Sequence, residues 1–256
     1  MCRPALLTIA TFAAVNLAQA GTVYTMSEKI GPNPGNTRLS VEGESLRMDQ
    51  SGEDTVIFSG SKGHAVTIDH KKQSYMVIDR SAMAQLNPAL EQMRKRLESL
   101  PPEQRAMAEK MMRGNRPANE PAEQRWTITP SGQTDSQAGI DCEWYDVSLD
   151  GKLSQRLCMA EPDDVIGGRA ALANMRAMAL FFDEVFAEIR KNFPVPMPDN
   201  PMANIDKIDG FPIITQELSN GTLRSDLRLE SAEEATLGSG TFDPPATYSQ
   251  QKFGSR

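Results

Sequence analysis

Residues Arg169–Phe193 read RAALANMRAMALFFDEVFAEIRKNF, and the rest of the chain must be arranged around them. Apolar residues recur here at steps of three and four, which gathers them on one face of an α-helix. They are Leu172, Met175, Ala179, Phe182, Phe186, Ile189 and Phe193, with Met178, Phe181 and Val185 widening the stripe. Burying seven such side chains contributes on the order of 10–20 kcal/mol before conformational entropy is subtracted. The sequence therefore predicts a helix that lies against an apolar surface.

Short runs rich in β-branched and aromatic residues flank this helix, and turn residues separate them. The predicted strands lie at 22–30, up to Val41, around Leu46 and Met48, and at 55–58, 65–68, 75–78 and 125–129, with Gly31–Gly35 as a break. This spacing is typical of an antiparallel meander. The predicted fold class is therefore α+β, with an antiparallel sheet wrapped on the long helix.

A first tight turn predicts how two strands pair. If Leu149–Gly151 form a three-residue loop with Gly151 in the left-handed conformation, Ser148 faces Lys152 and Cys142 lies opposite Cys158. Trp144 then shares the face of the cysteines. The predicted buried face is the other one, which carries Tyr145, Val147, Leu149, Leu153 and Leu157.

A second turn, Asn220-Gly221, favours the type I′ conformation. It joins predicted strands at 211–218 and 222–229. The resulting register sets Leu218 against Leu223, Ile214 against Leu227, and Glu217 against Arg224.

Between the two groups of strands, the apolar period changes to that of helices. We expect one helix from an N-cap at Ser81 to the prolines 101–102, and a shorter one from there to Gly114. Residues 116–121 contain two prolines and no large apolar side chain, which is typical of a link. We interpret about 81–121 as a helical insertion in a single β-rich domain of residues 21–256.

Residues 1–20 have the features of a secretory signal peptide. Arg3 precedes an uncharged run, and Ala18-Gln19-Ala20 is a suitable cleavage site. No later apolar run is long enough to span a membrane. Removal of the signal changes the net charge from −7 to −8, and an acidic chain is a poor binder of nucleic acid. We therefore expect a periplasmic or secreted protein.

Cys142 and Cys158 are the two cysteines that follow the signal. In an oxidising compartment such a pair favours one disulfide bond. Closing this loop would stabilise the fold by about 3 kcal/mol in the chain-entropy model. Two free buried thiols are one alternative, and a catalytic redox pair is another, although such pairs usually have C-x-x-C spacing.

His64 and His70 are the only histidines, and both lie in or beside predicted turns. No nucleophile elbow, phosphate loop, dinucleotide fingerprint or His-Glu-x-x-His motif accompanies them. Surface histidines and a solvated acidic surface are the simpler interpretation. We therefore expect no enzyme, no metal site and no cofactor.

Methionine is the one biased residue type, with 14 in the chain. Flexible thioether side chains adapt to acyl chains or apolar peptides. The predicted lining of an apolar cleft is Met83, Leu86, Leu90, Met93, Met107, Met111, Met175, Met178, Phe182 and Phe186. Two other interpretations stay open. One is ordinary core packing, and the other is capture of Cu(I) by thioethers, whose usual tracts alternate methionine with polar residues.

Five segments, DHKKQSYM at 69–76, LPPEQR at 100–105, AGIDCEWY at 138–145, GFP at 210–212 and FDPPATY at 242–248, together resemble a bacterial envelope family. This is the domain of unknown function 4412, which is similar in outline to LolA/LolB-like periplasmic lipoprotein carriers and receptors. The resemblance spans about 22–248. It implies an incomplete, curved antiparallel barrel closed by helices around a cavity for acyl chains. The methionine-bearing insertion departs from the pattern of those carriers.

Together these features predict a non-enzymatic, exported carrier or binding protein. An apolar ligand or lipoprotein acyl chain would enter a cleft between sheet and helix, and the insertion would cover its mouth. The alternative is an interaction module whose insertion helices dock on another envelope protein.

Overall fold

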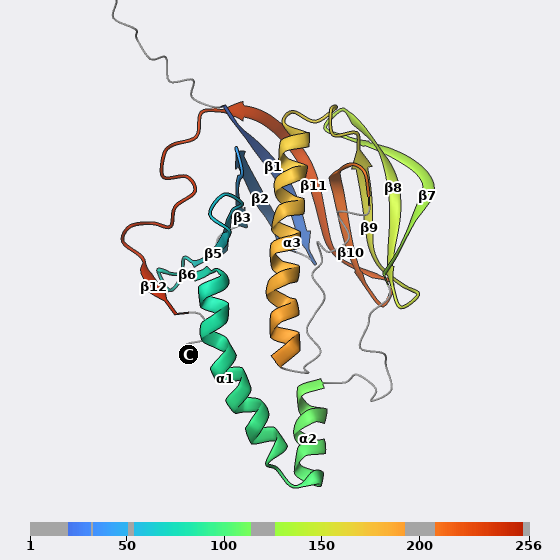
Figure 1. Cartoon of the computed structure of the whole chain (residues 1–256). Helices are drawn as coiled ribbons and strands as arrows, with labels where there is room; N and C mark the ends of the chain where they lie inside the picture. Colours follow the sequence, from blue (N-terminus) through green and yellow to red (C-terminus); the bar gives the residue numbers. More distant parts are fainter. Residues whose placement is uncertain (1–19, 32, 51–53, 114–125, 193–207, 253–256) are drawn as a thin grey trace, which may run out of the picture.

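The computed structural model describes residues 20–31, 33–50, 54–113, 126–192 and 208–252. The described helices are α1 (Arg80–Glu98), α2 (Pro102–Arg113) and α3 (Gly168–Asn192). The described strands are β1 (Gly21–Ile30), β2 (Asn33–Glu42), β3 (Ser45–Gln50), β4 (Asp54–Ser59), β5 (His64–Asp69), β6 (Ser74–Ile78), β7 (Trp126–Gln137), β8 (Ile140–Leu149), β9 (Lys152–Ala160), β10 (Phe211–Ser219), β11 (Thr222–Ala235) and β12 (Ser249–Gln251). All of them belong to one sheet (Figure 1).

The sheet consists of two meanders that meet at the pair β1–β11. Its order is β12-β6-β5-β4-β3-β2-β1-β11-β10-β9-β8-β7. Neighbouring strands are antiparallel, as expected, apart from β12, which runs parallel to β6. The sheet is therefore mixed. β12 is parallel to β6 because the segment before it crosses the outer face of β4–β6 and reaches the edge of the sheet in the direction of β6.

The sheet is curved and open. Extra residues in β7, β9, β10 and β11 shift the register against the neighbouring strands, and such bulges bend and twist the strands that carry them. The curl brings the end of β7 to β11, where the side-chain amide Nε2 of Gln137 donates a hydrogen bond of 2.8 Å to the carbonyl of Leu229. β12 and β7 remain as the two edges, so the barrel is incomplete, as expected.

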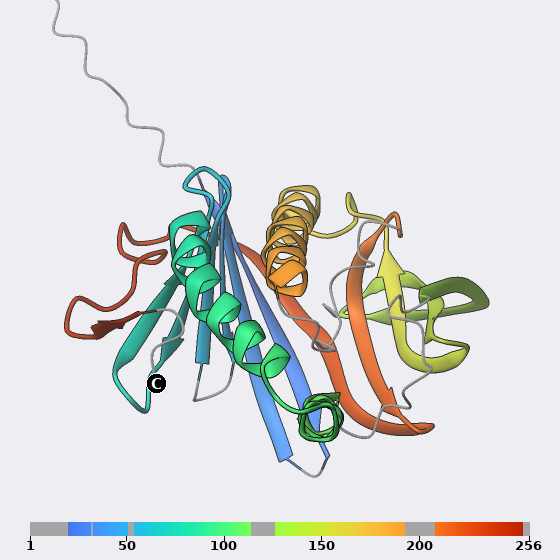
Figure 2. The same cartoon turned by 60° about the horizontal axis from the view of Figure 1, so that its bottom comes forward.

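Helix α3 lies against the concave face of the sheet, as Figure 2 shows. Its predicted bounds are confirmed to within one residue, although Phe193 is outside the described residues. Leu172, Met178 and Val185 are buried in the main core cluster, and α3 contacts β2, β3 and β10. At its start, the Tyr24 hydroxyl donates to the carbonyl of Ile166 at 2.8 Å. One face of the long helix thus packs against the sheet, as the apolar stripe predicts.

Helices α1 and α2 form the predicted insertion between β6 and β7 (Figure 1). The N-cap of α1 is Asp79 instead of the predicted Ser81. The Asp79 carboxylate accepts the backbone N–H of Ala82 at 2.7 Å and the hydroxyl of Ser81 at 2.8 Å. A carboxylate can accept both donors, so the helix begins at Arg80, one residue before Ser81.

The register predicted for β8 and β9 is wrong. Asp150 and Gly151 form a two-residue turn, with both residues at positive φ, and Ser154 adds a bulge by donating to the Val147 carbonyl at 3.0 Å. Trp144 consequently pairs with Cys158. Cys142 lies diagonally across from Cys158, with a Cα–Cα distance of 5.3 Å, and the predicted disulfide forms.

The assignment of the buried face of β8–β9 is also corrected. Val147 is buried as expected, but Leu153 is exposed, and the face of Trp144 and the disulfide is buried. Cys142, Trp144 and Cys158 belong to the main core cluster, which the sequence pattern does not indicate. The guanidinium of Arg156 lies 4.7 Å from the centre of the Trp144 ring, where a cation–π contact closes the cluster toward solvent.

The second hairpin follows its prediction only near the turn. Asn220 and Gly221 both have positive φ, and Leu218 pairs with Leu223 as expected. A bulge beyond Leu218 then shifts the register by one residue. In place of the predicted pairs, Ile214 lies opposite Arg228, and Glu217 lies opposite Ser225.

A second apolar cluster lies on the outer face of β4–β6, opposite α3. It contains Ile57, Val66 and Ile68, and the segment between β11 and β12 covers it with Phe242 and Tyr248. The Arg47 side chain fixes this segment by donating to the Thr241 carbonyl at 2.9 Å. Both faces of this part of the sheet are therefore covered.

The predicted signal peptide lies outside the described residues apart from Ala20, and the predicted link at 116–121 lies outside them entirely. No helix in the described part of the chain combines the length and apolarity needed to cross a membrane.

Candidate functional site

A ladder of aromatic rings leads from the core along α3 toward the insertion. Phe58 of β4 is buried and lies 5.7 Å from Phe181, measured between ring centres. Phe181 is followed by Phe182 at 5.4 Å, and Phe182 by Phe186 at 6.1 Å. The last three rings are half-buried. The apolar core is thus continuous with a partly accessible surface on the C-terminal half of α3.

Helix α1 lies beside this half of α3, and Figures 1 and 2 show both helices on the same side of the sheet. Arg80 of α1 forms a 3.7 Å ion pair with Glu184 of α3, although both side chains are exposed. Asp79 fixes where α1 leaves the sheet. The candidate site is therefore the surface between α1 and the C-terminal half of α3.

The predicted cleft residues fall into two groups. Met178 is part of the core, Met175 and Phe182 pack against it, and Phe186 is half-buried. Met93, Met107 and Met111 are 47%, 67% and 80% exposed on α1 and α2. Met83, Leu86 and Leu90 belong to α1, but their side chains are outside the described set. The structure therefore brings together the α3 residues, whereas the three described methionines of the insertion face solvent.

Two grooves have linings that do not include the aromatic side chains of α3. One, of about 380 Å³, is lined by residues at the start of α1 and by β12. The other, of about 650 Å³, lies beside the disulfide and is lined by six carboxylates: Asp135, Asp141, Glu143, Glu161, Asp164 and Asp209. The acidic residues were expected on a dispersed solvated surface. The groove could not be predicted from the sequence because its carboxylates come from four separate chain segments.

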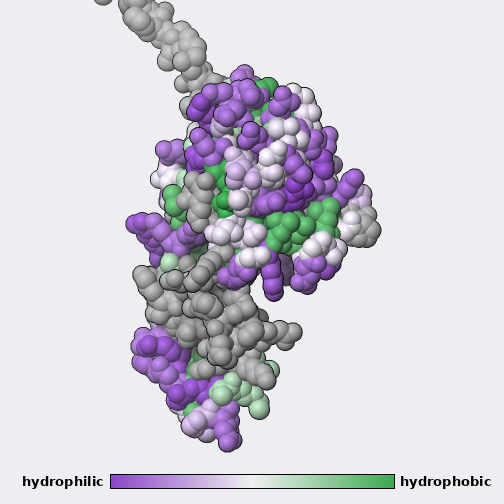
Figure 3. All heavy atoms as spheres, turned by 90° about the vertical axis from the view of Figure 1, so that its right-hand side faces the viewer, coloured by the Kyte–Doolittle hydropathy of each residue, from purple (hydrophilic) through white to green (hydrophobic). Residues whose placement is uncertain are grey.

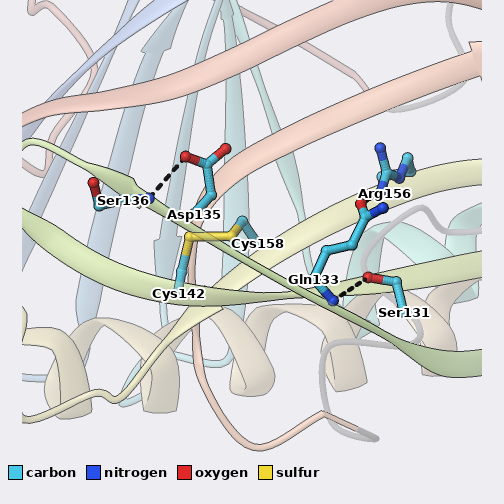
Figure 4. The surroundings of a disulfide bond; sticks show 7 residues. All are labelled: Ser131, Gln133, Asp135, Ser136, Cys142, Arg156 and Cys158. Atoms are coloured by element: carbon cyan, nitrogen blue, oxygen red, sulfur yellow. Dashed lines mark hydrogen bonds between the residues drawn. A yellow bond between two sulfur atoms is a disulfide. The ribbon is translucent and has the colours of Figure 1, made fainter.

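Figure 4 shows the surroundings of the disulfide between β8 and β9. Asp135 accepts the backbone N–H of Ser136 at 2.8 Å, which turns its carboxylate back onto its own strand. Arg156 donates to the side-chain oxygen of Gln133 at 2.7 Å and also pairs with Asp146. In the described residues, no group of three or more His, Cys, Asp or Glu side chains is arranged to hold a metal ion.

His70 has a structural environment that the sequence does not indicate. Its Nε2 lies 2.9 Å from the hydroxyl of Thr55, and its Nδ1 lies 3.0 Å from the hydroxyl of Tyr248. Thr55 in turn donates to the carboxylate of Asp49 at 2.6 Å. The hydroxyl of Thr55 is thereby left to accept from Nε2–H, and in the neutral ring Nδ1 accepts from the hydroxyl of Tyr248. His70 lies in a turn after β5, as expected, but it is half-buried and joins β4 to the C-terminal segment.

Asp49 anchors this network, and its ionisation makes stability depend on pH. Burial acts to raise its pKa, but hydrogen bonds from Arg47 and Thr55 and the Arg47 charge together hold the pKa below the ordinary 3.8. The folded state therefore favours the carboxylate, and its stabilisation is present above pH 3.8 and lost as pH falls through the lowered pKa.

We expect Asp49→Asn to lower the free energy of unfolding by about 1–2 kcal/mol at neutral pH, since charge-assisted hydrogen bonds are lost. The difference from the wild type should shrink below pH 3.8. Urea unfolding at several pH values measures both quantities. If the two proteins differed in unfolding free energy by the same amount at every pH, the stabilisation would not come from the ionised carboxylate of Asp49.

The comparisons with known proteins add no functional residue. No family model matches the chain, and no curated protein matches it. Among solved structures, PNGF-II is similar with a TM-score of 0.40 and 7% identity, over 91% of this chain and 31% of that one. The Pseudomonas aeruginosa MucA/MucB complex is similar with a TM-score of 0.39 and 12% identity, over 90% of this chain and 58% of that one. MucB alone is similar with a TM-score of 0.38 and 11% identity, over 91% of this chain and 60% of that one. The chain thus spans less than two thirds of the length of each neighbour.

Proposed function

We propose that this protein is an exported, non-enzymatic carrier or binding protein of the bacterial envelope, which takes an apolar ligand between α1 and the C-terminal half of α3. The observation that carries the proposal is the aromatic ladder from Phe58 to Phe186. Ligand sites are mostly lined by apolar and aromatic side chains. Half-buried rings that continue the core offer such a lining and remain within reach of a ligand.

The same geometry limits where a ligand can lie. The N-terminal half of α3 is packed against the sheet through Leu172 and Met178, so that interface is occupied by side chains. A ligand is therefore placed beyond Met178, along Phe182 and Phe186, where α1 lies opposite. Moving α1 away would open this surface without breaking the core.

An acyl chain is the ligand class that suits this surface, since a ladder of rings is long and lacks charge. The resemblance to the domain of unknown function 4412 supports the same class and a place in the bacterial envelope. The disulfide between Cys142 and Cys158 is in keeping with an oxidising compartment. Capture of Cu(I) by the exposed methionines remains a separate prediction, and a Cu(I) competition titration tests it.

Uptake of a fluorescent fatty acid, cis-parinaric acid, tests the proposal on the mature protein. We expect saturable binding by the wild type. The double variant Phe182→Ala/Phe186→Ala should weaken this binding about tenfold or more, because the loss of each ring removes about 1 kcal/mol or more of apolar contact with the ligand. Leu180→Ala is the matched control, since Leu180 is 58% exposed on the same helix. Its affinity should equal that of the wild type.

Native mass spectrometry of protein purified from its own envelope provides the second measurement. A co-purified lipid that is lost in the double variant supports the proposal. Absence of lipid together with no fatty-acid uptake by the wild type would contradict it.

A further inference from the structure

Charge is divided unevenly between the α1–α2 hairpin, residues 80–113, and the rest of the chain. The hairpin contains seven Lys and Arg and four Glu, a net charge of +3, whereas the whole chain carries −7. The remainder therefore carries −10. A basic, methionine-bearing hairpin thus projects from an acidic body, as the position of α2 in Figure 1 shows.

The charges on α1 are ordered around its apolar stripe. Successive residues of an α-helix are 100° apart, so Met93 and Leu97 lie on one side, with Arg94 and Arg96 at its two borders. Glu91, Lys95 and Glu98 lie on the opposite side, where Lys95 pairs with Glu91 at 3.1 Å. Arg94 and Arg96 are both exposed, and the 3.9 Å contact of Arg94 with Glu98 at the surface is weak. Basic side chains therefore border the apolar stripe, and acidic ones lie away from it.

Helix α2 adds two exposed methionines to this end of the molecule. Met107 and Met111 are one turn apart and are 67% and 80% exposed. Arg105 holds the hairpin together by donating to the carbonyls of Leu97 and Glu98 at the end of α1. The hairpin thus has a defined bend, and its methionines stay accessible.

We infer that the α1–α2 hairpin docks on an anionic lipid surface. Helices that lie in a membrane interface combine an apolar face with Lys and Arg on the polar face. Anionic headgroups attract such basic side chains, while the methionines enter the headgroup boundary. The acidic body is repelled by the same surface, so the molecule is oriented with the hairpin toward the lipid. Figure 3 shows apolar residues among hydrophilic ones at this lower end.

This inference does not depend on the apolar ligand proposed above. Vesicle binding and fatty-acid uptake are separate measurements, and either can fail without the other. A protein partner on the hairpin is the competing interpretation, and the same experiment separates the two.

Co-sedimentation of the mature protein with vesicles tests the inference. We expect binding to phosphatidylglycerol-containing vesicles, little binding to pure phosphatidylcholine vesicles, and a decrease as salt rises. Arg94→Gln/Arg96→Gln should weaken binding about 25-fold, since each basic side chain near an anionic surface contributes roughly fivefold. Met107→Ser/Met111→Ser should also weaken it, and this loss should persist at high salt.

The matched control is Arg38→Gln/Arg224→Gln, which removes the same charge from exposed positions of β2 and β11. It should bind as the wild type does. Circular dichroism and urea unfolding establish that every variant is folded. Equal binding to both kinds of vesicle, no binding to either, or unchanged binding by the hairpin variants would overturn the inference. Cross-linking of the hairpin to one envelope protein without vesicle binding would replace the lipid with a protein partner.

Discussion

Met178→Ala is expected to lower the free energy of unfolding by about 2–5 kcal/mol, whereas Leu180→Ala should change it by less than about 0.5 kcal/mol. The two residues are two positions apart on α3. Met178 is 2% exposed and Leu180 is 58% exposed. Both substitutions shorten a long apolar side chain on the same helix, and both introduce the best helix former. Their difference therefore isolates the contact between α3 and the sheet.

The physical reason is the cavity that alanine leaves at position 178. Met178 belongs to the core cluster between α3 and the sheet, and a packed interior relaxes only partly around a lost side chain. At position 180, water already contacts the side chain. Urea unfolding followed by circular dichroism measures both variants. Equal losses would mean that α3 does not pack on the sheet through this face.

Removal of the disulfide is expected to cost about 3 kcal/mol, the second large effect. Cys142 and Cys158 close a loop with a sequence separation of 16, and both residues are buried beside Trp144. The bond restricts the unfolded chain, so its loss raises the entropy of unfolding. The buried sulfur atoms also fill space on the covered face of β8 and β9.

The measurement compares Cys142→Ala/Cys158→Ala with the wild type, in the presence and absence of dithiothreitol. We expect the reductant to destabilise the wild type and to leave the double variant unchanged. Alanine avoids placing a hydroxyl in the buried site. A double variant as stable as the oxidised wild type would contradict the expected contribution.

The sequence was sufficient for the helices and the first six strands, but not for β12, the full length of β7 or the strand registers. The period of α3 and the turns between strands are local properties, and they place every strand from β1 to β6 correctly to within a few residues. A bulge is different, because one extra residue such as Ser154 changes each pair beyond it and leaves no mark in the apolar pattern. The pairing of Cys142 with Cys158 survived this error because a disulfide also forms between diagonal positions.

The candidate site shows the same division. Met178 and Met111 obey the same helical spacing, yet one is in the core and the other is exposed. Spacing assigns a residue to a face, but only the partner of that face decides its burial. The position of His70 depends on Tyr248, which is 178 residues away, so no local signal could reveal it.

The short strand β12 has a consequence for how copies of this protein meet. A free sheet edge presents unpaired N–H and C=O groups, on which strands of other molecules add and stack into fibrils. Here the three-residue strand β12 pairs with β6 and takes its place as the edge of the sheet, and the backbone N–H of Ser249 also donates to the carbonyl of Gln73 at 3.1 Å. A strand of three residues offers few backbone groups with which another strand could pair. It therefore opposes edge-to-edge polymerisation at this end of the sheet.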